Sequence, residues 1–269
     1  MADDETRSDG IAYEVSEGRA EITLNRPATY KTFDGEMLAA LNERLLDARA
    51  DDDVYVILLT GRGDGFCSGT DVSNMDGRED RKNAATYGAH LWAVRYVNRQ
   101  LLFGEKPTIA AVNGPAVGAG CDFALSCDLR VMAKDAFLRE QFVNVGLVPG
   151  DGGAWTLPRL IGESKAKECL LTGRDITAAD AEDLGLVVDA VPDDELMRTA
   201  RELADEIREK PATAVRNTKA LVDTTRSFAE YCAAAHEKQW ECITDPEHRA
   251  AVEAVAEDIL DNYKHARNP

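Results

Sequence analysis

The sequence of 269 residues is poor in bases, aromatic residues and metal-binding patterns. None of its six cysteines forms a C-x-x-C pair and its four histidines lack an H-x-x-x-H spacing, so we expect neither structural zinc nor a disulfide framework. No internal repeat is visible, which argues against solenoids and propellers. No run approaches 18 uninterrupted apolar residues, and the polar segment MADDETRSDG lacks the apolar stretch of a secretory signal. We therefore expect a cytoplasmic protein.

Acidic residues dominate the charge of the chain. The 49 Asp and Glu exceed the 31 Lys and Arg, which gives a net charge of −18. Because binding to nucleic acid or to an anionic membrane needs clustered bases, neither is an expected partner. The excess of acids has two interpretations. They keep the protein in solution, or they are an adaptation to a high-salt cytoplasm, where salt screens their mutual repulsion.

The first half of the chain has the pattern of an α/β protein. Two short apolar runs, at 11–15 and 20–24, flank Glu17-Gly18 and predict a hairpin. Asp34 precedes an apolar stripe of helical spacing, so it is the expected N-cap of an amphipathic helix. The evenly apolar run at 54–60 predicts a strand that is covered on both faces, which completes a β–α–β crossover.

Further strands and helices follow in the second half. Strands are expected at 108–112 and 129–133, with a buried helix at 119–127 between them and a long helix at 86–103 before them. From Gly153 onward the pattern is almost wholly helical, with the change to a helical C-terminal portion near 190–210. The expected helices there are 153–161, 163–171, 177–184, 193–209, 211–225, 227–242 and 247–264.

Two glycine-rich segments, 61–72 and 113–122, each follow a covered strand. Glycine lets the backbone approach a ligand, and the second segment leads into a helix whose first N–H groups have no internal partner. Two such N–H groups directed at one carbonyl oxygen form an oxyanion hole. The alternative is that both segments are ordinary turns at strand ends.

Other chemistries fit these segments less well. No phosphate-binding G-x-x-x-x-G-K-[ST] pattern is present, and the Gly61, Gly63 and Gly65 series does not open a helix as a dinucleotide-binding fingerprint would. Ser68 and Cys67 lie beside glycines, but they are not in a G-x-S-x-G pattern and no histidine lies nearby in the sequence. A nucleophilic serine or cysteine is therefore disfavoured.

Five ordered motifs between about Ile11 and Val191 resemble those of the crotonase superfamily, which contains the enoyl-CoA hydratases and isomerases. Two of them are the glycine-rich segments, which are similar to the F-x-[AS]-G-x-D-[ILV] and A-x-x-G-x-[AC]-x-G-[AG]-G patterns of that family. The motifs are Asn25-Arg26-Pro27, Phe66 to Val72, Ala111 to Asp122, Gly146 to Arg159, and Thr172 to Val188.

This resemblance implies an α/β crotonase fold, in which repeated ββα units form a spiral of two stacked sheets. It divides the chain into a core with the acyl-CoA site at 1–200 and a helical portion at 201–269 that covers the site or forms a trimer. A homotrimer or a homohexamer is the implied assembly. Glu247-His248-Arg249 departs from the family pattern at the corresponding place.

The resemblance also implies how the site works. The backbone N–H groups of Thr70 and Ala119 match the pair that holds the thioester oxygen, while the Thr70 hydroxyl is expected to face solvent without a role. Of the two glutamates of the hydratases, the first corresponds to Asp122 and the second to Phe142, which cannot transfer a proton. Asp151 and Glu140 are the nearby substitutes. Alternatively, Asp151 caps a helix and Glu140 pairs with Arg139 or with solvent.

The implied activity is the addition of water to a 2-enoyl-CoA. Isomerisation of the double bond, which needs one proton-shuttling acid, and acyl-CoA binding without catalysis are the alternatives. Neither a metal nor a redox group is required, because coenzyme A enters as part of the substrate. The positions implied to bind it are Arg26, Ala28, Tyr30, Arg62 and Val72.

Overall fold

The structure is a computed structural model that describes residues 10–26, 33–70, 84–222 and 227–254. By its internal contacts the chain divides into two compact units, Met1–Asp205 and Glu206–Pro269. The first contains both sheets and the second is helical in its described part.

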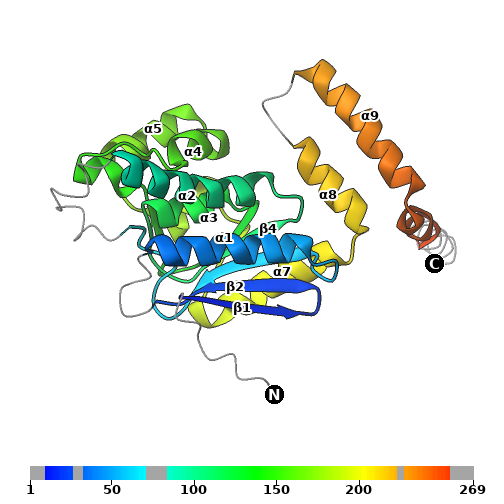
Figure 1. The fold of residues 1–269 in the computed structure, drawn as a ribbon, viewed down its shortest axis with the longest axis horizontal. Coiled ribbons are helices and arrows are strands. Elements are labelled where there is room, and N and C mark those ends of the chain that lie inside the picture. The colour runs from blue at the N-terminus through cyan, green and yellow to red at the C-terminus, as the bar shows by residue number, and fades with distance from the viewer. Residues whose placement is uncertain (1–9, 27–32, 71–83, 223–226, 255–269) are drawn as a thin grey trace, which may run out of the picture. The chain divides into compact units, whose positions relative to one another are not determined.

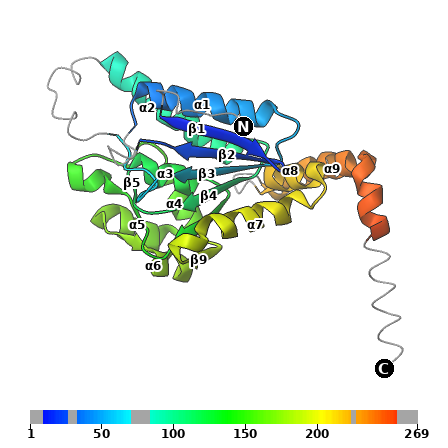
Figure 2. The same cartoon turned by 90° about the horizontal axis from the view of Figure 1, so that it is seen from below.

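A six-stranded sheet forms the centre of the first unit (Figures 1 and 2). Its strands follow the order β1-β2-β3-β4-β6-β9, and only the pair β1 and β2 is antiparallel. The strands span Ile11–Ser16 (β1), Arg19–Leu24 (β2), Val56–Gly61 (β3), Thr108–Val112 (β4), Leu129–Ala133 (β6) and Asp189–Val191 (β9).

The sheet confirms the strands predicted from the first half of the sequence. The hairpin closes through Glu17 and Gly18, which both have positive φ (50° and 77°), as a two-residue turn between twisted strands requires. Every residue of β3 and β4 is buried, as expected of parallel strands covered on both faces. The carboxyl ends of these two strands lead into the two glycine-rich segments.

Helices α1 and α2 lie side by side in the first unit (Figure 1). Helix α1, Gly35–Ala50, begins as predicted, because the Asp34 carboxylate accepts a hydrogen bond of 2.9 Å from the Met37 N–H. Helix α2, Ala84–Phe103, also contacts α3, Ala119–Ser126, which is buried along its whole length. Helix α2 thus reaches from the outer layer to the segment that carries Asp122.

A second sheet of three short strands lies beside this core. Strand β5, Ala116–Val117, pairs with β7, Phe137–Arg139, and β7 pairs with β8, Ile176–Thr177. The remaining helices of this unit are the 3₁₀ helices η4 (Gln141–Val145) and η5 (Asp193–Glu195), and α4 (Gly153–Ile161), α5 (Glu163–Thr172), α6 (Ala178–Asp183) and α7 (Leu196–Arg208), of which α7 extends past Asp205.

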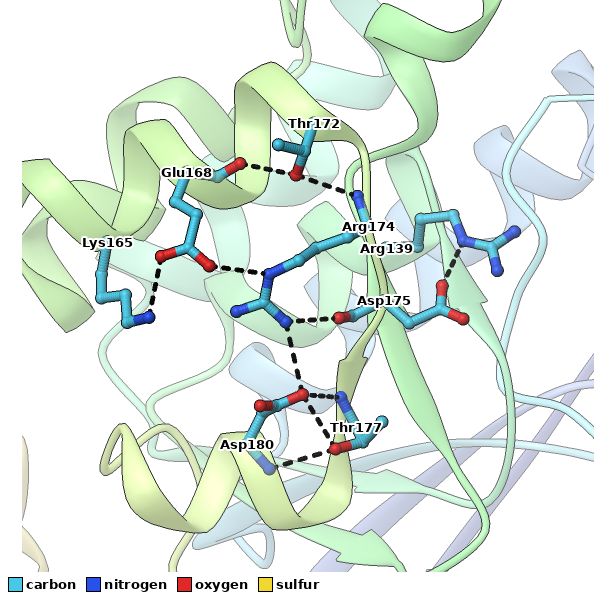
Figure 3. Close-up of polar contacts among 8 residues, drawn as sticks. All are labelled: Arg139, Lys165, Glu168, Thr172, Arg174, Asp175, Thr177 and Asp180. Atoms are coloured by element: carbon cyan, nitrogen blue, oxygen red, sulfur yellow. Dashed lines mark hydrogen bonds and ion pairs between the residues drawn. The ribbon is translucent and has the colours of Figure 1, made fainter.

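A polar network joins α5, α6 and the second sheet (Figure 3). Arg174 donates from Nε to the Glu168 carboxylate at 3.1 Å and from Nη1 to the Asp175 carbonyl at 2.9 Å. The Asp175 carboxylate accepts a hydrogen bond from Arg139, the last residue of β7. The network therefore anchors β7 at the point where the chain turns toward Glu140.

The second unit contains α8, Ala212–Leu221, then α9, Phe228–Thr244, and a helical segment at 246–254. These agree with the predicted helices, although α8 ends earlier than the expected limit of 225 and residues from 255 onward lie outside the described part. Helices α8 and α9 are joined by the Asn217 amide, which donates to the Lys238 carbonyl at 3.2 Å.

Candidate active site

The two glycine-rich segments meet backbone to backbone at the carboxyl ends of β3 and β4. The Val117 N–H donates to the Cys67 carbonyl at 2.8 Å. Gly69 has a φ of 76°, and a Cβ on it would lie 2.9 Å from the Val117 oxygen and 3.2 Å from the Ala119 nitrogen. A Cβ on Gly120 would overlap the Cys67 carbonyl. Glycine is therefore required at both positions for the segments to approach.

This contact places Thr70 and Ala119 along one cleft. The Gly69 carbonyl accepts a hydrogen bond of 3.0 Å from the Phe33 N–H, and a trans peptide directs the Thr70 N–H to the opposite side. Gly118 is the N-cap of α3, so the Ala119 N–H is the first of the helix and has no intrahelical partner. In the described part of the chain neither N–H has an acceptor. Both groups are therefore available to a bound acceptor.

The cleft offers about 160 Å³ of space to water-sized groups. Its wall combines a few polar side chains with a larger apolar surface, as is usual for small-molecule sites. The lining residues are Ser68, Gly69, Thr70, His90, Leu91, Arg95, Val117, Gly118, Ala119, Gln141, Phe142, Val145, Leu147, Val148, Gly150 and Asp151.

Three carboxyl groups are buried next to the cleft. Asp122 on α3 is 1% exposed, Glu140 after β7 is 2% exposed and Asp151 before α4 is 7% exposed. Asp151 lines the cleft, whereas the other two are absent from its wall. Both oxygens of Asp122, both of Glu140 and one of Asp151 have no hydrogen-bond donor among the described residues. Because ionised carboxylates only accept, a hydrogen bond between these groups requires a proton.

Burial raises the pKa of all three groups. For Asp122, burial and then the charges of Glu140 and Asp151 raise the pKa well above its ordinary range. Burial raises the pKa of Glu140 to about 7. It raises the pKa of Asp151 to about 6, although the positive charge of Arg95 acts in the opposite direction. The cluster therefore holds protons near neutral pH, as acid–base catalysis requires.

The structure contradicts the two purely structural roles that the sequence offered for Glu140 and Asp151. Glu140 pairs neither with solvent nor with Arg139, because it is buried and Arg139 bonds to Asp175. Asp151 does not cap a helix, because the N-cap of α4 is Gly152 and no side chain caps it. A Cβ at the next position, Gly153, would lie 2.5 Å from the Glu140 carboxyl carbon. The Glu140 carboxyl thus packs directly against the start of α4.

Two side chains of α2 hold the segment that carries Asp151, and the sequence analysis did not identify either. Arg95 donates from Nε to the Gly150 carbonyl at 2.9 Å, and Asn98 donates from Nδ2 to the Asp151 carbonyl at 2.9 Å. Their spacing of three residues puts both on one side of the helix. That spacing was visible in the sequence, but it carries no information about the partner segment.

His90 is a further lining residue that the sequence analysis missed. Its Nε2 lies 3.1 Å from the Thr70 Oγ1, and its ring centroid lies 5.9 Å from that of Phe33. The prediction that the Thr70 hydroxyl faces solvent is therefore wrong. Burial lowers the pKa of His90, which favours the neutral ring at pH 7.

The expected coenzyme A contacts are only partly described. Ala28, Tyr30 and Val72 lie outside the described residues. The Arg26 guanidinium donates to the Asp34 carboxylate, and Arg62 is exposed; neither lines the cleft.

Residues 14–261 match the enoyl-CoA hydratase/isomerase family. The chain belongs to this family. It is 33% identical over 243 residues to a short-chain-enoyl-CoA hydratase of Clostridium acetobutylicum, with 88% of this chain and 91% of that protein covered. It is 34% identical over 220 residues to 1,2-epoxyphenylacetyl-CoA isomerase of Escherichia coli, with 81% and 83% covered.

Solved structures agree with the family assignment. The crystal structure of an enoyl-CoA hydratase from Bacillus anthracis has a TM-score of 0.87 and 28% identity, and the match covers 93% of this chain and 96% of that chain. The crotonase fold and the enzyme class predicted from the sequence are thus confirmed. In the described part of the chain, no helix combines the length and apolar character needed to cross a membrane.

Proposed function

We propose that this protein hydrates short 2-enoyl-CoA thioesters in the cleft between the two glycine-rich segments. The observation that carries the proposal is the position of three buried carboxyl groups beside two backbone N–H donors without acceptors. The hydratase name of the relative from Clostridium acetobutylicum supports short acyl chains.

The backbone donors stabilise the charge that develops on the substrate. The thioester oxygen accepts hydrogen bonds from the N–H groups of Thr70 and Ala119, and the dipole of α3 adds positive potential at Ala119. When water adds to the β-carbon, electrons move to the thioester oxygen and form an enolate. Donors fixed in advance stabilise this oxyanion without reorganisation at the moment of reaction.

The carboxyl groups transfer the protons. Asp151, which lines the cleft, accepts the proton that the attacking water loses. A carboxyl of the cluster then donates a proton to the α-carbon, so that one water molecule is added in total. Asp122 and Glu140 lie behind Asp151 and hold the protons of the cluster, which keeps acid and base forms available near neutral pH.

Isomerisation of the double bond is a second candidate, and one observation favours it. Among the described residues, Asp151 supplies the only carboxyl in the wall of the cleft, and the Phe142 side chain lies where a second acid was expected. A single carboxyl suffices to remove a proton from one carbon and return it to another. The isomerase name of the Escherichia coli relative agrees with this chemistry.

Turnover of 2-enoyl-CoA and 3-enoyl-CoA by the wild type, Asp151→Asn and Asp135→Asn tests the proposal. Asp135 is an exposed acid outside the cleft, so its variant controls for a changed charge. We expect Asp151→Asn to lose on the order of 10²–10⁴-fold in kcat. Loss of the conjugated enoyl absorbance with a hydroxyacyl product identifies the hydratase, and conversion of 3-enoyl to 2-enoyl identifies the isomerase. Thioester binding without either reaction would indicate a non-catalytic protein.

The remaining predictions concern the conditions and the assembly of the protein. We propose a homotrimer or homohexamer that needs no cofactor beyond the coenzyme A of its substrate, which sedimentation and assays of dialysed protein test. A salt-adapted surface and a cytoplasmic location stay predictions. The net charge of −18 supports the first, because salt relieves repulsion between acids, and activity measured against salt concentration tests it.

A further inference from the structure

Arg95 presents a positive charge to the cleft, and its guanidinium carbon lies 5.8 Å from the centroid of the Trp92 ring. It is half-buried, and among the described lining residues it is the only arginine or lysine. Its Nε donates to the Gly150 carbonyl at 2.9 Å. A guanidinium has five N–H donors, and in the described part of the chain the four on the terminal nitrogens have no acceptor.

Arg95 forms no ion pair with a described residue, although the chain has 49 acidic residues. Many of the described arginines lie within 4.0 Å of a carboxylate, whereas Arg95 makes no such ion pair with a described residue, Asp151 included. The paired arginines are Arg19, Arg26, Arg44, Arg139, Arg174, Arg198, Arg201 and Arg249. A partly desolvated guanidinium gains most from a bound anion, and a carboxylate fits its planar donors.

The surroundings leave this charge accessible from the acyl site. A Cβ on Gly150 would lie 3.6 Å from Arg95 Nη2, so that nitrogen lies next to a residue that lines the cleft. Thr70, Ala119 and Asp151 line the same cleft. An acyl group whose thioester oxygen occupies the Thr70 and Ala119 donors therefore extends within the space that Arg95 also borders.

We propose that Arg95 binds a terminal carboxylate on the acyl group, which makes enoyl-CoA thioesters of short dicarboxylic acids the substrate class. This inference rests on the proposed function, because it places the thioester at Thr70 and Ala119. The carboxylate forms charge-assisted hydrogen bonds with the terminal nitrogens of Arg95 while Nε stays on Gly150. The carboxylate of the substrate thus becomes the anionic partner of Arg95, which no described residue provides.

Two substrates that differ in charge but hardly in shape test this assignment. They are 4-carboxybut-2-enoyl-CoA and its amide, 4-carbamoylbut-2-enoyl-CoA, and they are assayed with the wild type, Arg95→Met, Arg95→Lys and Arg99→Met. Arg99 lies one turn further along α2, is exposed and does not line the cleft, so it is a matched control. The ratio of kcat/KM for the two substrates cancels any effect that Arg95 has on Asp151 or on protein folding.

We expect the wild type to favour the carboxylate and Arg95→Met to reduce that preference on the order of 10²-fold. Arg95→Lys keeps part of it, because the charge remains without the planar fork, and Arg99→Met keeps all of it. Equal losses for both substrates would overturn the proposal. If equal losses also occur with pantetheine thioesters, Arg95 positions the Gly150 segment. If the losses disappear with pantetheine thioesters, Arg95 binds a phosphate of coenzyme A.

Binding of saturated analogues separates this inference from the proposed function. Calorimetry with 4-carboxybutyryl-CoA and 4-carbamoylbutyryl-CoA requires no turnover. Preference for the carboxylate that disappears in Arg95→Met supports the assignment even if no enoyl-CoA reacts. Equal affinities for the two analogues overturn it, and failure of both to bind overturns the proposed function as well.

Discussion

Replacing Glu140 with glutamine should stabilise the protein, and the gain should grow with pH. Glu140 is 2% exposed and has no described hydrogen-bond donor, so its ionised form is costly in the folded state. Burial raises its pKa from 4.5 to about 7, while in the unfolded chain it titrates near its ordinary value. The folded wild type therefore loses stability as pH rises from about 4.5 to about 7. Glutamine has no charge to acquire over that range.

The size of the effect follows from linkage. Each tenfold change in an acid dissociation constant corresponds to about 1.4 kcal/mol, so the wild type loses about 3 kcal/mol in total. The advantage of Glu140→Gln due to ionisation is then about 1 kcal/mol at pH 5 and about 3 kcal/mol at pH 8. Hydrogen bonds that the glutamine amide gains or lacks change the free energy of unfolding by an amount that does not vary with pH. The cluster titrates jointly, so the values belong to the three acids together.

Urea unfolding of the wild type and the variant at several pH values between 5 and 8, at one fixed salt concentration, measures the difference. Asp135→Asn is the control, because it removes the charge of an exposed acid outside the buried cluster. A difference between Glu140→Gln and wild type that stays constant from pH 5 to pH 8 would refute the reasoning. It would mean that Glu140 ionises as easily in the folded protein as in the unfolded chain.

Two further predictions concern the geometry of the site. Gly153→Ala should cost about 1–3 kcal/mol and reduce turnover, because its Cβ would displace the Glu140 carboxyl; unfolding and kinetics measure both, with Gly35→Ala, where a Cβ meets open space, as the control. His90→Phe and Thr70→Val should each lower kcat about tenfold with little change in KM, because their 3.1 Å contact fixes the Thr70 donor. In a double-mutant cycle the combined variant should be no worse than either single variant, and additive losses would contradict the role of this contact.

Local signals in the sequence predicted the long elements of the fold. Strong periodicity and a capping residue identify a helix such as α1, and an unbroken apolar run identifies a strand such as β3. The short strands β5 and β8 have two residues each, too few for any periodicity to show. They form through contacts between segments that are distant in the sequence. Ala116 of β5 pairs with Cys67, and β8 pairs with β7.

The part of the candidate site that consists of backbone groups was predictable from the sequence. Glycines identified the segments that bring Thr70 and Ala119 to one cleft, since close approach leaves no room for a Cβ. Side chains from α2 were not predictable, because helical spacing shows which residues share a face but not what they meet. The burial of Glu140 was predictable from its neighbour. Side chains of successive residues in an extended chain point to opposite sides, so an outward Arg139 implies an inward Glu140.

The distance between Arg95 and Asp151 matters for both proposals. A guanidinium in contact with a carboxylate favours the ionised form, and a direct ion pair would lower the pKa of Asp151. In this structure Arg95 lowers that pKa from further away, and burial keeps it at about 6. Asp151 can therefore still take up and release a proton near neutral pH. The same separation leaves the terminal nitrogens of Arg95 without a carboxylate partner among the described residues. In the two proposals, one arrangement therefore provides both the proton transfer and the recognition of a charged acyl group.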